Sequence, residues 1–342
     1  ENDFSQIEDN TIIITQELTT SDTAKINMKK VSGIISEIGG TNSHVSIIAR
    51  NKQIPMIIRV EDVMNKIKEG DIISVDIGAC KNGYHGDKAS AKVCQDIVLK
   101  ALSVGPLSRN VTIKGGVVMR SKTNNVRRAT QDLDIDFIKY SLADESIDAF
   151  ISKLNCLDGI KISRLGKIEE LKQQDYSGKQ VFILIEDAEG NQVRSKIDLG
   201  VHKHLEIEQV EYCFDIAFDD EGASLLANTR EQMFAEKLRS LLKFGSFSTR
   251  YKDVYDMYYQ CGRMDKEKLT QCLHTFIFDD SGMRENDINA IVKRVEFVFS
   301  DKAYGKRVDT SDKRWLDDDI QAVFEGILNY LRGFCNGRYN NG

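Results

Sequence analysis

Residues 127–137 read Arg-Arg-Ala-Thr-Gln-Asp-Leu-Asp-Ile-Asp-Phe. Acidic and apolar residues alternate from Asp132 to Phe137, which predicts a β-strand. Residues two apart on a strand face the same side, so Asp132 and Asp134 project together. Such a pair binds Mg²⁺ together with substrate phosphates, although Asp-x-Asp is also common at a solvated strand edge.

The neighbouring sequence favours the metal-binding interpretation. Upstream, Lys114-Gly115-Gly116 lies in a segment predicted as a strand over Val111–Met119, and its glycines would let the backbone approach a nucleoside triphosphate closely. Downstream, Asp198 lies in the alternating segment Val193–Leu199 and could bring a third carboxylate to the same metal ions. Together these residues predict in-line phosphoryl transfer assisted by metal ions.

Further strands and helices are predicted from residue periodicity. The additional strands are Thr11–Ile14, Val31–Ile35, Pro55–Ile58, Ile72–Val75 and Val181–Glu186. The helices are a segment from Ser43 to Asn51, then Ala89–Ser103, Thr229–Phe244, Arg250–Cys261, Lys266–Ile277, Glu285–Phe299 and Trp315–Phe334.

The segment from about Cys94 to Tyr259 resembles the AbiEii toxin family of polymerase-beta-like nucleotidyltransferases. The resemblance is carried by the glycines, by Arg-x-Thr-x-Asp-Leu-Asp from Arg128, and by two further motifs, Ala235-Glu236-Lys237-Leu238 and Arg250-Tyr251-Lys252-Asp253-Val254-Tyr255-Asp256. Members of this family act as toxins in toxin–antitoxin or phage-defence systems. Some transfer nucleotides to the acceptor end of tRNA, so a tRNA or other RNA acceptor and a cognate antitoxin are implied as partners.

The resemblance also implies a role for each matching residue. Gly115 and Gly116 would cradle the phosphates, with Arg128 and Thr130 beside the nucleotide and Lys237 in contact with the triphosphate. Asp132, Asp134 and Asp198 would hold Mg²⁺, and Asp256, with Asp253, would complete the site. Two alternatives to these site roles stay open. Arg128 could be an exposed, solvated arginine with no contact to phosphate, and Asp256 could form an ordinary helix ion pair with Lys252, four residues earlier.

A second pattern occurs near the N-terminus, where Gly39-Gly40-Thr41-Asn42-Ser43-His44 precedes an apolar helical pattern. It places His44 in the first turn of a helix. Free backbone N–H groups and the positive helix end favour a phosphate there, and neutral imidazole is a nucleophile near pH 7. A lone histidine is, however, more often a structural or surface residue.

Residues from about Ile12 to Gly86 resemble the swivelling phosphohistidine domain of phosphoenolpyruvate-utilising enzymes, above all enzyme I of the sugar phosphotransferase system. The resemblance implies that His44 is the phosphorylated residue, with Ser43 and Arg50 beside it. Nothing after residue 90 resembles the phosphoenolpyruvate-binding barrel of enzyme I. We therefore expect a separate donor, such as a phosphorylated HPr-like carrier.

These patterns predict α/β and α+β architecture in three parts: a swivelling β/β/α phosphohistidine domain over residues 1–90, a mixed-sheet nucleotidyltransferase core over 91–225, and a helical part over 226–342. The net charge of −6 excludes a uniformly basic nucleic-acid-binding coat. The absence of an apolar run long enough to span a bilayer, and seven scattered cysteines, favour a cytoplasmic protein without membrane partners.

Three functional hypotheses remain open from the sequence. The first is a Mg²⁺-dependent nucleotidyltransferase acting on a nucleoside triphosphate. The second is a phosphocarrier or regulatory protein that is phosphorylated on His44 and whose remainder is an effector. The third is a fusion or fragment in which neither half is competent.

Overall fold

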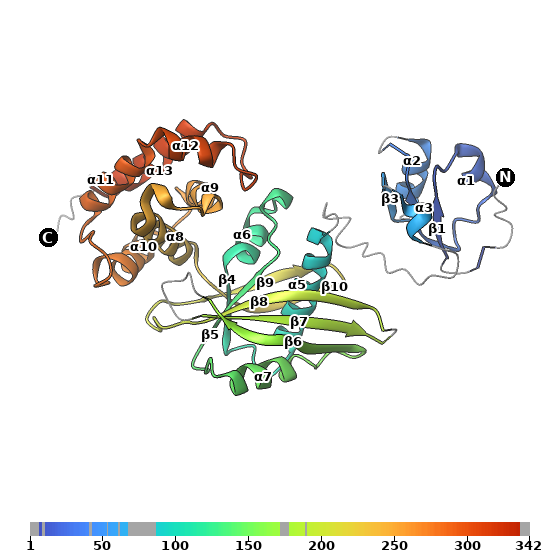
Figure 1. Cartoon of the computed structure of the whole chain (residues 1–342), viewed down its shortest axis with the longest axis horizontal. Helices are drawn as coiled ribbons and strands as arrows, with labels where there is room; N and C mark the ends of the chain where they lie inside the picture. The colour runs from blue at the N-terminus through green and yellow to red at the C-terminus, as the bar shows by residue number, and fades with distance from the viewer. Residues whose placement is uncertain are drawn as a thin grey trace. The chain divides into compact units, whose positions relative to one another are not determined.

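The computed structural model describes residues 7–8, 11–40, 43–52, 54–60, 62–67, 87–171, 178–188 and 190–335. The chain separates into two compact units, residues 1–93 and 94–342, each built around its own sheet (Figure 1). In these described ranges, no helix is both long enough and apolar enough to cross a membrane.

The first unit contains a parallel sheet in the order β1-β2-β3, formed by β1 (Thr11–Thr15), β2 (Val31–Ser36) and β3 (Met56–Ile58). Its helices are α1 (Thr20–Lys25), α2 (His44–Asn51) and α3 (Val63–Lys66). The sequence prediction of three of its strands is confirmed, whereas the predicted strand at Ile72–Val75 lies outside the described residues.

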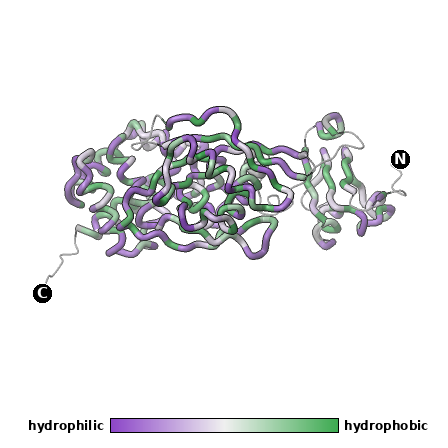
Figure 2. The backbone as a smooth tube through the Cα atoms, turned by 90° about the horizontal axis from the view of Figure 1, so that it is seen from below, coloured by the Kyte–Doolittle hydropathy of each residue, from purple (hydrophilic) through white to green (hydrophobic). Residues whose placement is uncertain are grey.

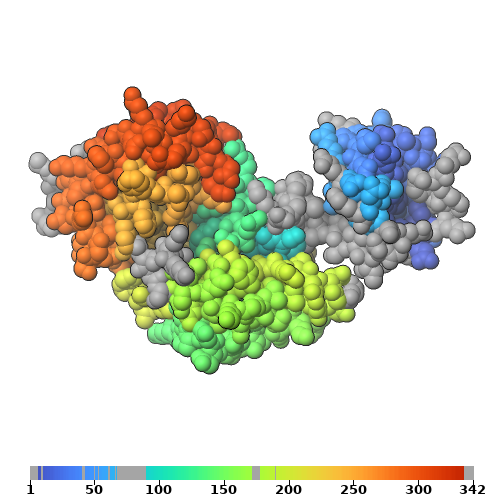
Figure 3. Space-filling view, in the orientation of Figure 1, coloured from blue at the N-terminus to red at the C-terminus, as the bar shows by residue number. Residues whose placement is uncertain are grey.

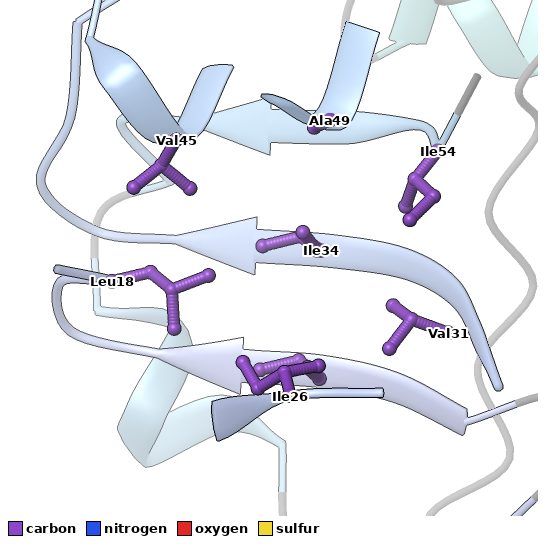
Figure 4. Packing of buried hydrophobic residues seen from close by; sticks show 8 residues of the cluster. Leu18, Ile26, Val31, Ile34, Val45, Ala49 and Ile54 are labelled. Atoms are coloured by element: carbon purple, nitrogen blue, oxygen red, sulfur yellow. The ribbon is translucent and has the colours of Figure 1, made fainter. Parts of the chain in front are cut away.

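The core of this unit lies between the sheet and α2 (Figure 4). Val45 and Ala49 are one helical turn apart and pack with Val31 and Ile34 of β2. This spacing explains why the segment forms a helix, since it places its apolar side chains on one face. His44 lies outside this buried face of α2 and is exposed.

The second unit contains a mixed seven-stranded sheet in the order β6-β7-β8-β5-β4-β10-β9. The central strands β4 (Val111–Lys114) and β5 (Leu133–Phe137) are antiparallel, while β5 pairs in parallel with β8 (Gln192–Val201). The remaining strands are β6 (Ile160–Glu170), β7 (Lys179–Asp187), β9 (Val210–Ile216) and β10 (Asp219–Ala227).

Helices follow the sheet in sequence and gather beside it as a separate lobe, orange to red in Figure 3. This lobe contains α8 (Arg230–Phe244), η2 (Gly245–Phe247), α9 (Tyr251–Gln260), α10 (Lys266–Leu273), the π-helical turn η3 (His274–Phe278), α11 (Ile288–Phe299), α12 (Lys302–Asp309) and α13 (Ile320–Cys335). The other helical elements of the unit are α5 (Asp87–Val104), α6 (Gly115–Thr123), η1 (Val126–Arg128) and α7 (Asp144–Lys153). Hydrophobic and hydrophilic residues alternate along much of the chain in Figure 2, as expected for elements with one buried face.

The expected fold class is confirmed, but one element is wrong. The segment Val111–Met119 is not a single strand, because it ends as a strand at Lys114 and continues as α6 from Gly115. Gly115 adopts φ of +67°, a left-handed conformation that interrupts the strand at no steric cost to glycine. The β-branched residues Val117 and Val118 are then buried on the new helix. Their strand propensity is overridden by packing.

Candidate active site

Two of the predicted carboxylates are brought together by strand register. In the parallel pair of β5 and β8, Asp134 lies directly opposite Asp198. On the other side of β5, the antiparallel register places Lys114 opposite Asp134. Two acidic residues separated by more than sixty positions in the sequence therefore occupy neighbouring positions at the centre of the sheet.

Glycine is required at positions 115 and 116 because β5 and the segment before it approach the backbone closely there. A Cβ on Gly115 would collide with the carboxylate of Asp134. A Cβ on Gly116 would lie 2.6 Å from Cβ of Thr130, whose backbone carbonyl accepts a hydrogen bond of 2.9 Å from the buried Gln95. Gly115 and Gly116 also form the first turn of α6, where backbone N–H groups are free to bind an anion.

The three predicted carboxylates differ in their pKa shifts and in their charged partners. Burial raises the pKa of Asp134 to about 6; Lys114 acts against this shift, and Asp198 adds to it. Burial also raises the pKa of Asp198, although Gln180 opposes the shift by donating a hydrogen bond of 2.8 Å. Asp132 is instead paired with Lys196 at 2.8 Å. Consistent with that pairing, no group of three or more His, Cys, Asp or Glu side chains arranged to hold a metal ion occurs among the described residues.

Asp136, the second aspartate of β5, has no role in the site predicted from sequence. Asp136 forms a 2.7 Å ion pair with Lys114, and both side chains are largely buried. The sequence alone could have indicated Asp136 as a site residue, because it continues the same alternation and lies on the same face of the strand as Asp134. Lys114 thus links β4 to the acidic face of β5.

The other charged residues predicted for the site form a buried network. Arg128 donates two hydrogen bonds of 2.6 Å to the carboxylate of Asp256, which also accepts one from Trp315 at 3.0 Å. Lys237 lies 2.9 Å from Asp256 and 2.7 Å from Asp253. The network joins η1 beside the sheet to α8 and α9 of the helical lobe.

The pKa shifts in this network follow from the ion pairs. Burial acts to raise the pKa of Asp253, but Lys237 and Arg250 outweigh it and bring the pKa to about 2. Burial likewise opposes ionisation of Asp256, yet Arg128 and Lys237 lower its pKa. These carboxylates are therefore charged at neutral pH, and their charges are matched inside the protein. Arg128 and Asp256 thus form a buried ion pair with each other. The alternative that Arg128 is exposed and solvated is wrong, because its side chain is buried.

A cavity of about 520 Å³ opens beside these residues. Its wall includes Lys114, Gly115 and Asp134 from the sheet side, and Lys237 and Arg250 from the helical side. The volume lies within the range of small-molecule sites. The wall also includes Glu236 of the Ala235–Leu238 motif. Sequence reasoning did not find the rest of the wall, which comes from segments far apart in the chain and includes His202, His204, Gln232, Phe244 and Phe276.

In the first unit, His44 is exposed and is the first residue of α2. Ser43 caps the helix, since its Oγ accepts a hydrogen bond of 3.2 Å from the backbone N–H of Ser46. The hydroxyl of Ser46 in turn donates to the carbonyl of Gly40 at 2.8 Å. Ser43 therefore adjoins His44 as expected, while the side chain of Arg50 lies outside the described residues.

Comparison with known families identifies the class of the second unit. The family model described as "Nucleotidyl transferase AbiEii toxin, Type IV TA system" matches residues 97–321, about two thirds of the chain. The chain therefore belongs to the AbiEii nucleotidyl transferase toxin family.

The first unit matches a different model, that of the mobile domain of PEP-utilising enzymes, over residues 7–79. It is 40% identical over 74 residues to a phosphoenolpyruvate-protein phosphotransferase of Mycoplasma pneumoniae and 43% identical over 74 residues to one of Buchnera aphidicola. A Staphylococcus aureus protein of the same name is 39% identical over 83 residues. The matches span 22–24% of this chain and only 13–14% of those relatives. This chain thus joins a PEP-utiliser mobile domain to an AbiEii nucleotidyl transferase domain.

Proposed function

We propose that the second unit transfers a nucleoside monophosphate from a nucleoside triphosphate to a hydroxyl group of an RNA acceptor, such as tRNA, with Mg²⁺ as the metal. The observation that carries this proposal is the register of β5 and β8, which sets Asp134 beside Asp198 at the Gly115 turn. Both Asp134 and Gly115 line the cavity, so acidic oxygens and free helix N–H groups face the same space.

The side chains present fit a magnesium ion. Mg²⁺ in nucleotide-dependent sites is usually held by one or two carboxylates, and water and phosphate oxygens complete its shell. Asp134 and Asp198 supply that pair, and the raised pKa values of both indicate that their charges are not fully matched by the protein. Asp132 would join them once Lys196 releases it. The ion would supply charge neutralisation at the transferred phosphate.

Residues of the chain act both on the attacking hydroxyl and on the triphosphate. The acceptor oxygen attacks the α-phosphorus, the bond from that phosphorus to the bridging oxygen breaks, and pyrophosphate leaves with the bonding electrons. The proton of the acceptor hydroxyl passes to a carboxylate of the Asp134–Asp198 pair. The N–H groups at Gly115 and Gly116 bind phosphate oxygens, and Lys237 and Arg250, which line the same cavity, contact the triphosphate.

Substitution of Asp134 by Asn tests this proposal. Label from an α-labelled nucleoside triphosphate should enter RNA only with Mg²⁺ or Mn²⁺ present, and Asp134→Asn should lower the rate by roughly 100-fold or more, because a metal ligand loses its charge. Asp148→Asn is the matched control, since Asp148 is a half-exposed carboxylate paired with Arg164 on the outside of α7. Full activity of Asp134→Asn would exclude the assignment.

A second candidate function rests on the first unit, where His44 is exposed at a capped helix start. We propose that His44 accepts phosphate from a phosphorylated histidine carrier of the HPr type. The phosphate oxygens would lie at the free N–H groups of the first turn of α2. The imidazole nitrogen forms the new bond to phosphorus, and the carrier histidine leaves with the electrons of its own P–N bond.

This second function predicts a label with a distinctive chemistry. The purified chain should be labelled by phosphorylated HPr and not by phosphoenolpyruvate alone, and acid should remove the label whereas alkali should spare it. A His44→Ala chain should remain unlabelled, while a chain with the exposed His274 replaced by Ala should label normally. Label that persists in His44→Ala would show that another residue is phosphorylated.

A further inference from the structure

Two unusually exposed aromatic side chains lie on η2, in the turn between α8 and α9, and on α11. Phe247, in η2, is 91% exposed, and Phe297, on α11, is 66% exposed. The element η2 packs against α11, and a Cβ on Gly245 would lie 2.8 Å from the guanidinium of Arg294 on that helix. Two exposed aromatic rings thus lie on elements that pack against each other.

Two arginines belong to the same surface. Arg294 donates to the backbone carbonyl of Leu242 at 3.4 Å, and its guanidinium lies 5.7 Å from the centre of the Phe297 ring. Arg307, on α12, donates to the carbonyl of Ser246 at 2.7 Å. Neither arginine has a carboxylate within ion-pair distance among the described residues.

Two arginines, Arg294 and Arg307, and one carboxylate, that of Asp301, contribute charge to this surface. The acidic side chain that interacts with Arg307 is Asp301, which is occupied as the cap of α12 through the N–H groups of Ala303 and Tyr304. The bonds to backbone carbonyls orient the guanidinium groups but do not neutralise their charge. We refer to Phe247, Phe297, Arg294 and Arg307 as the α8–α9 platform.

The platform adjoins the cavity of the candidate active site through continuous chain. Phe244 ends α8 and lines the cavity, Arg250 lines it from the start of α9, and the five residues between them carry Phe247. Arg250 is itself 60% exposed at its side chain while it pairs with Asp253. An acceptor bound at this turn would therefore lie beside residues that line the cavity.

From this arrangement we infer that the α8–α9 platform binds the unpaired end of an RNA acceptor. The bases stack on Phe247 and Phe297, and Arg294 and Arg307 contact the phosphates, which is the combination that single-stranded nucleic acid sites use. A reaction that consumes a terminal hydroxyl needs such an end to be held outside the cavity. The inference rests on the proposed nucleotidyl transfer, and it adds where the acceptor binds and that its end is single-stranded.

Binding can be measured separately from transfer. The probe is a 5′-labelled single-stranded RNA of about ten nucleotides, within the range of roughly 4–16 nucleotides per site, titrated with the full chain in the absence of nucleotide. Fluorescence anisotropy should show that Phe247→Ala weakens binding by about 5- to 100-fold, whereas Phe247→Trp retains it, because a larger aromatic face still stacks. The blunt duplex of the same sequence should bind less tightly than the single strand.

The chain offers a matched control in Phe218, which is 54% exposed on the turn between β9 and β10. Phe218→Ala should leave the dissociation constant unchanged. Arg294→Gln should reduce the slope of log K against log salt by about 0.7, as expected for one lost phosphate contact to a single strand. Equal weakening by Phe218→Ala and Phe247→Ala, or none by Phe247→Ala, would overturn the inference and leave this face to a protein partner.

The two proposals can fail independently. If the wild-type chain transfers no nucleotide to any RNA but Phe247→Ala selectively weakens binding of the probe, the proposed reaction is wrong and the platform stands as an RNA site. If transfer occurs and Phe247→Ala changes neither probe binding nor the Michaelis constant for RNA, the platform is wrong and the reaction stands.

Discussion

Each unit places a pair of glycines next to the start of a helix that carries its candidate site, and the two pairs have different surroundings. In the second unit, a Cβ on Gly115 would collide with Asp134 and one on Gly116 would lie 2.6 Å from Thr130. In the first unit, a Cβ on Gly40 would meet nothing within 4 Å. A Cβ on Gly39, however, would lie 3.2 Å from a methyl group of Ile58. Both glycines of the second unit are thus enclosed, whereas in the first unit only Gly40, the glycine nearer the helix, is open.

The same contrast extends to the charged groups. Asp256 is fully buried among Arg128, Lys237 and Trp315, three residues from distant parts of the chain. His44 is exposed and depends on Ser43 and Ser46, which are its close neighbours in sequence. Substitutions around the buried Asp256 should affect the stability of the whole second unit. Substitutions around the exposed His44 should have local effects.

The largest expected effect is on the buried network. Arg128→Ala leaves Asp256 with fewer partners in a position without access to water, and breaking a buried pair in this way costs about 3–5 kcal/mol of unfolding free energy. Urea unfolding followed by the fluorescence of Trp315, the single tryptophan of the sequence, reports on this unit directly. The midpoint of that transition should fall accordingly.

Arg127 provides the matched control for Arg128 because it is the adjacent residue of the same type. Its 2.7 Å ion pair with Asp317 is exposed, at 49% for the arginine side chain and 89% for the aspartate. Arg127→Ala should change the unfolding free energy by about 0–1 kcal/mol, as for other surface pairs. Equal destabilisation by the two substitutions would remove the contrast between a buried and an exposed site.

Next in size is the effect of a methyl group at the enclosed turn. Gly115→Ala introduces a Cβ into the space of the Asp134 carboxylate at φ of +67°, a conformation that costs roughly 1–2 kcal/mol for other residues. We expect nucleotidyl transfer to fall by about 100-fold, because displaced active-site groups have effects of that order. Gly40→Ala, measured in the same assay and for labelling of His44, should have little effect on either reaction.

The sequence predicted the strands that carry Asp134 and Asp198, but not the contacts between the side chains. Asp134 and Asp198 lie on strands that were predicted because alternation is a local pattern, whereas Asp132 lies just before β5 rather than on it. That Asp198 lies opposite Asp134 depends on the order of strands in the sheet, and that Asp132 pairs with Lys196 depends on side-chain geometry. Neither property is encoded within one window of sequence.

Local sequence also misjudged the segment after Lys114. Val117, Val118 and Met119 favour a strand by composition, but Gly115 turns the chain and α6 buries them. Several elements were not predicted, among them β6, β9, β10, α7 and α12. Some of them do carry a pattern: buried residues alternate along β9 and along the end of β10, and α7 buries Ile147, Phe150 and Ile151 on one face. In contrast, α8 begins after Thr229 and ends at Phe244 as predicted, because a threonine cap and a helical apolar pattern agree there.

The smallest expected effect belongs to the open site and tests whether it is as local as we infer. Ser43→Ala removes the acceptor of the Ser46 N–H at the start of α2, a helix cap that contributes typically about 1 kcal/mol. Hydrogen exchange of the Ser46 amide should accelerate by about fivefold, which corresponds to that free energy. The unfolding transition reported by Trp315 should not move, because Trp315 lies in the second unit. Labelling of His44 should persist at a reduced rate, since the first turn of α2 that would bind the phosphate is populated less often. If Ser43→Ala instead shifts the Trp315 transition, stability is shared between the units, and the exposed site is not local.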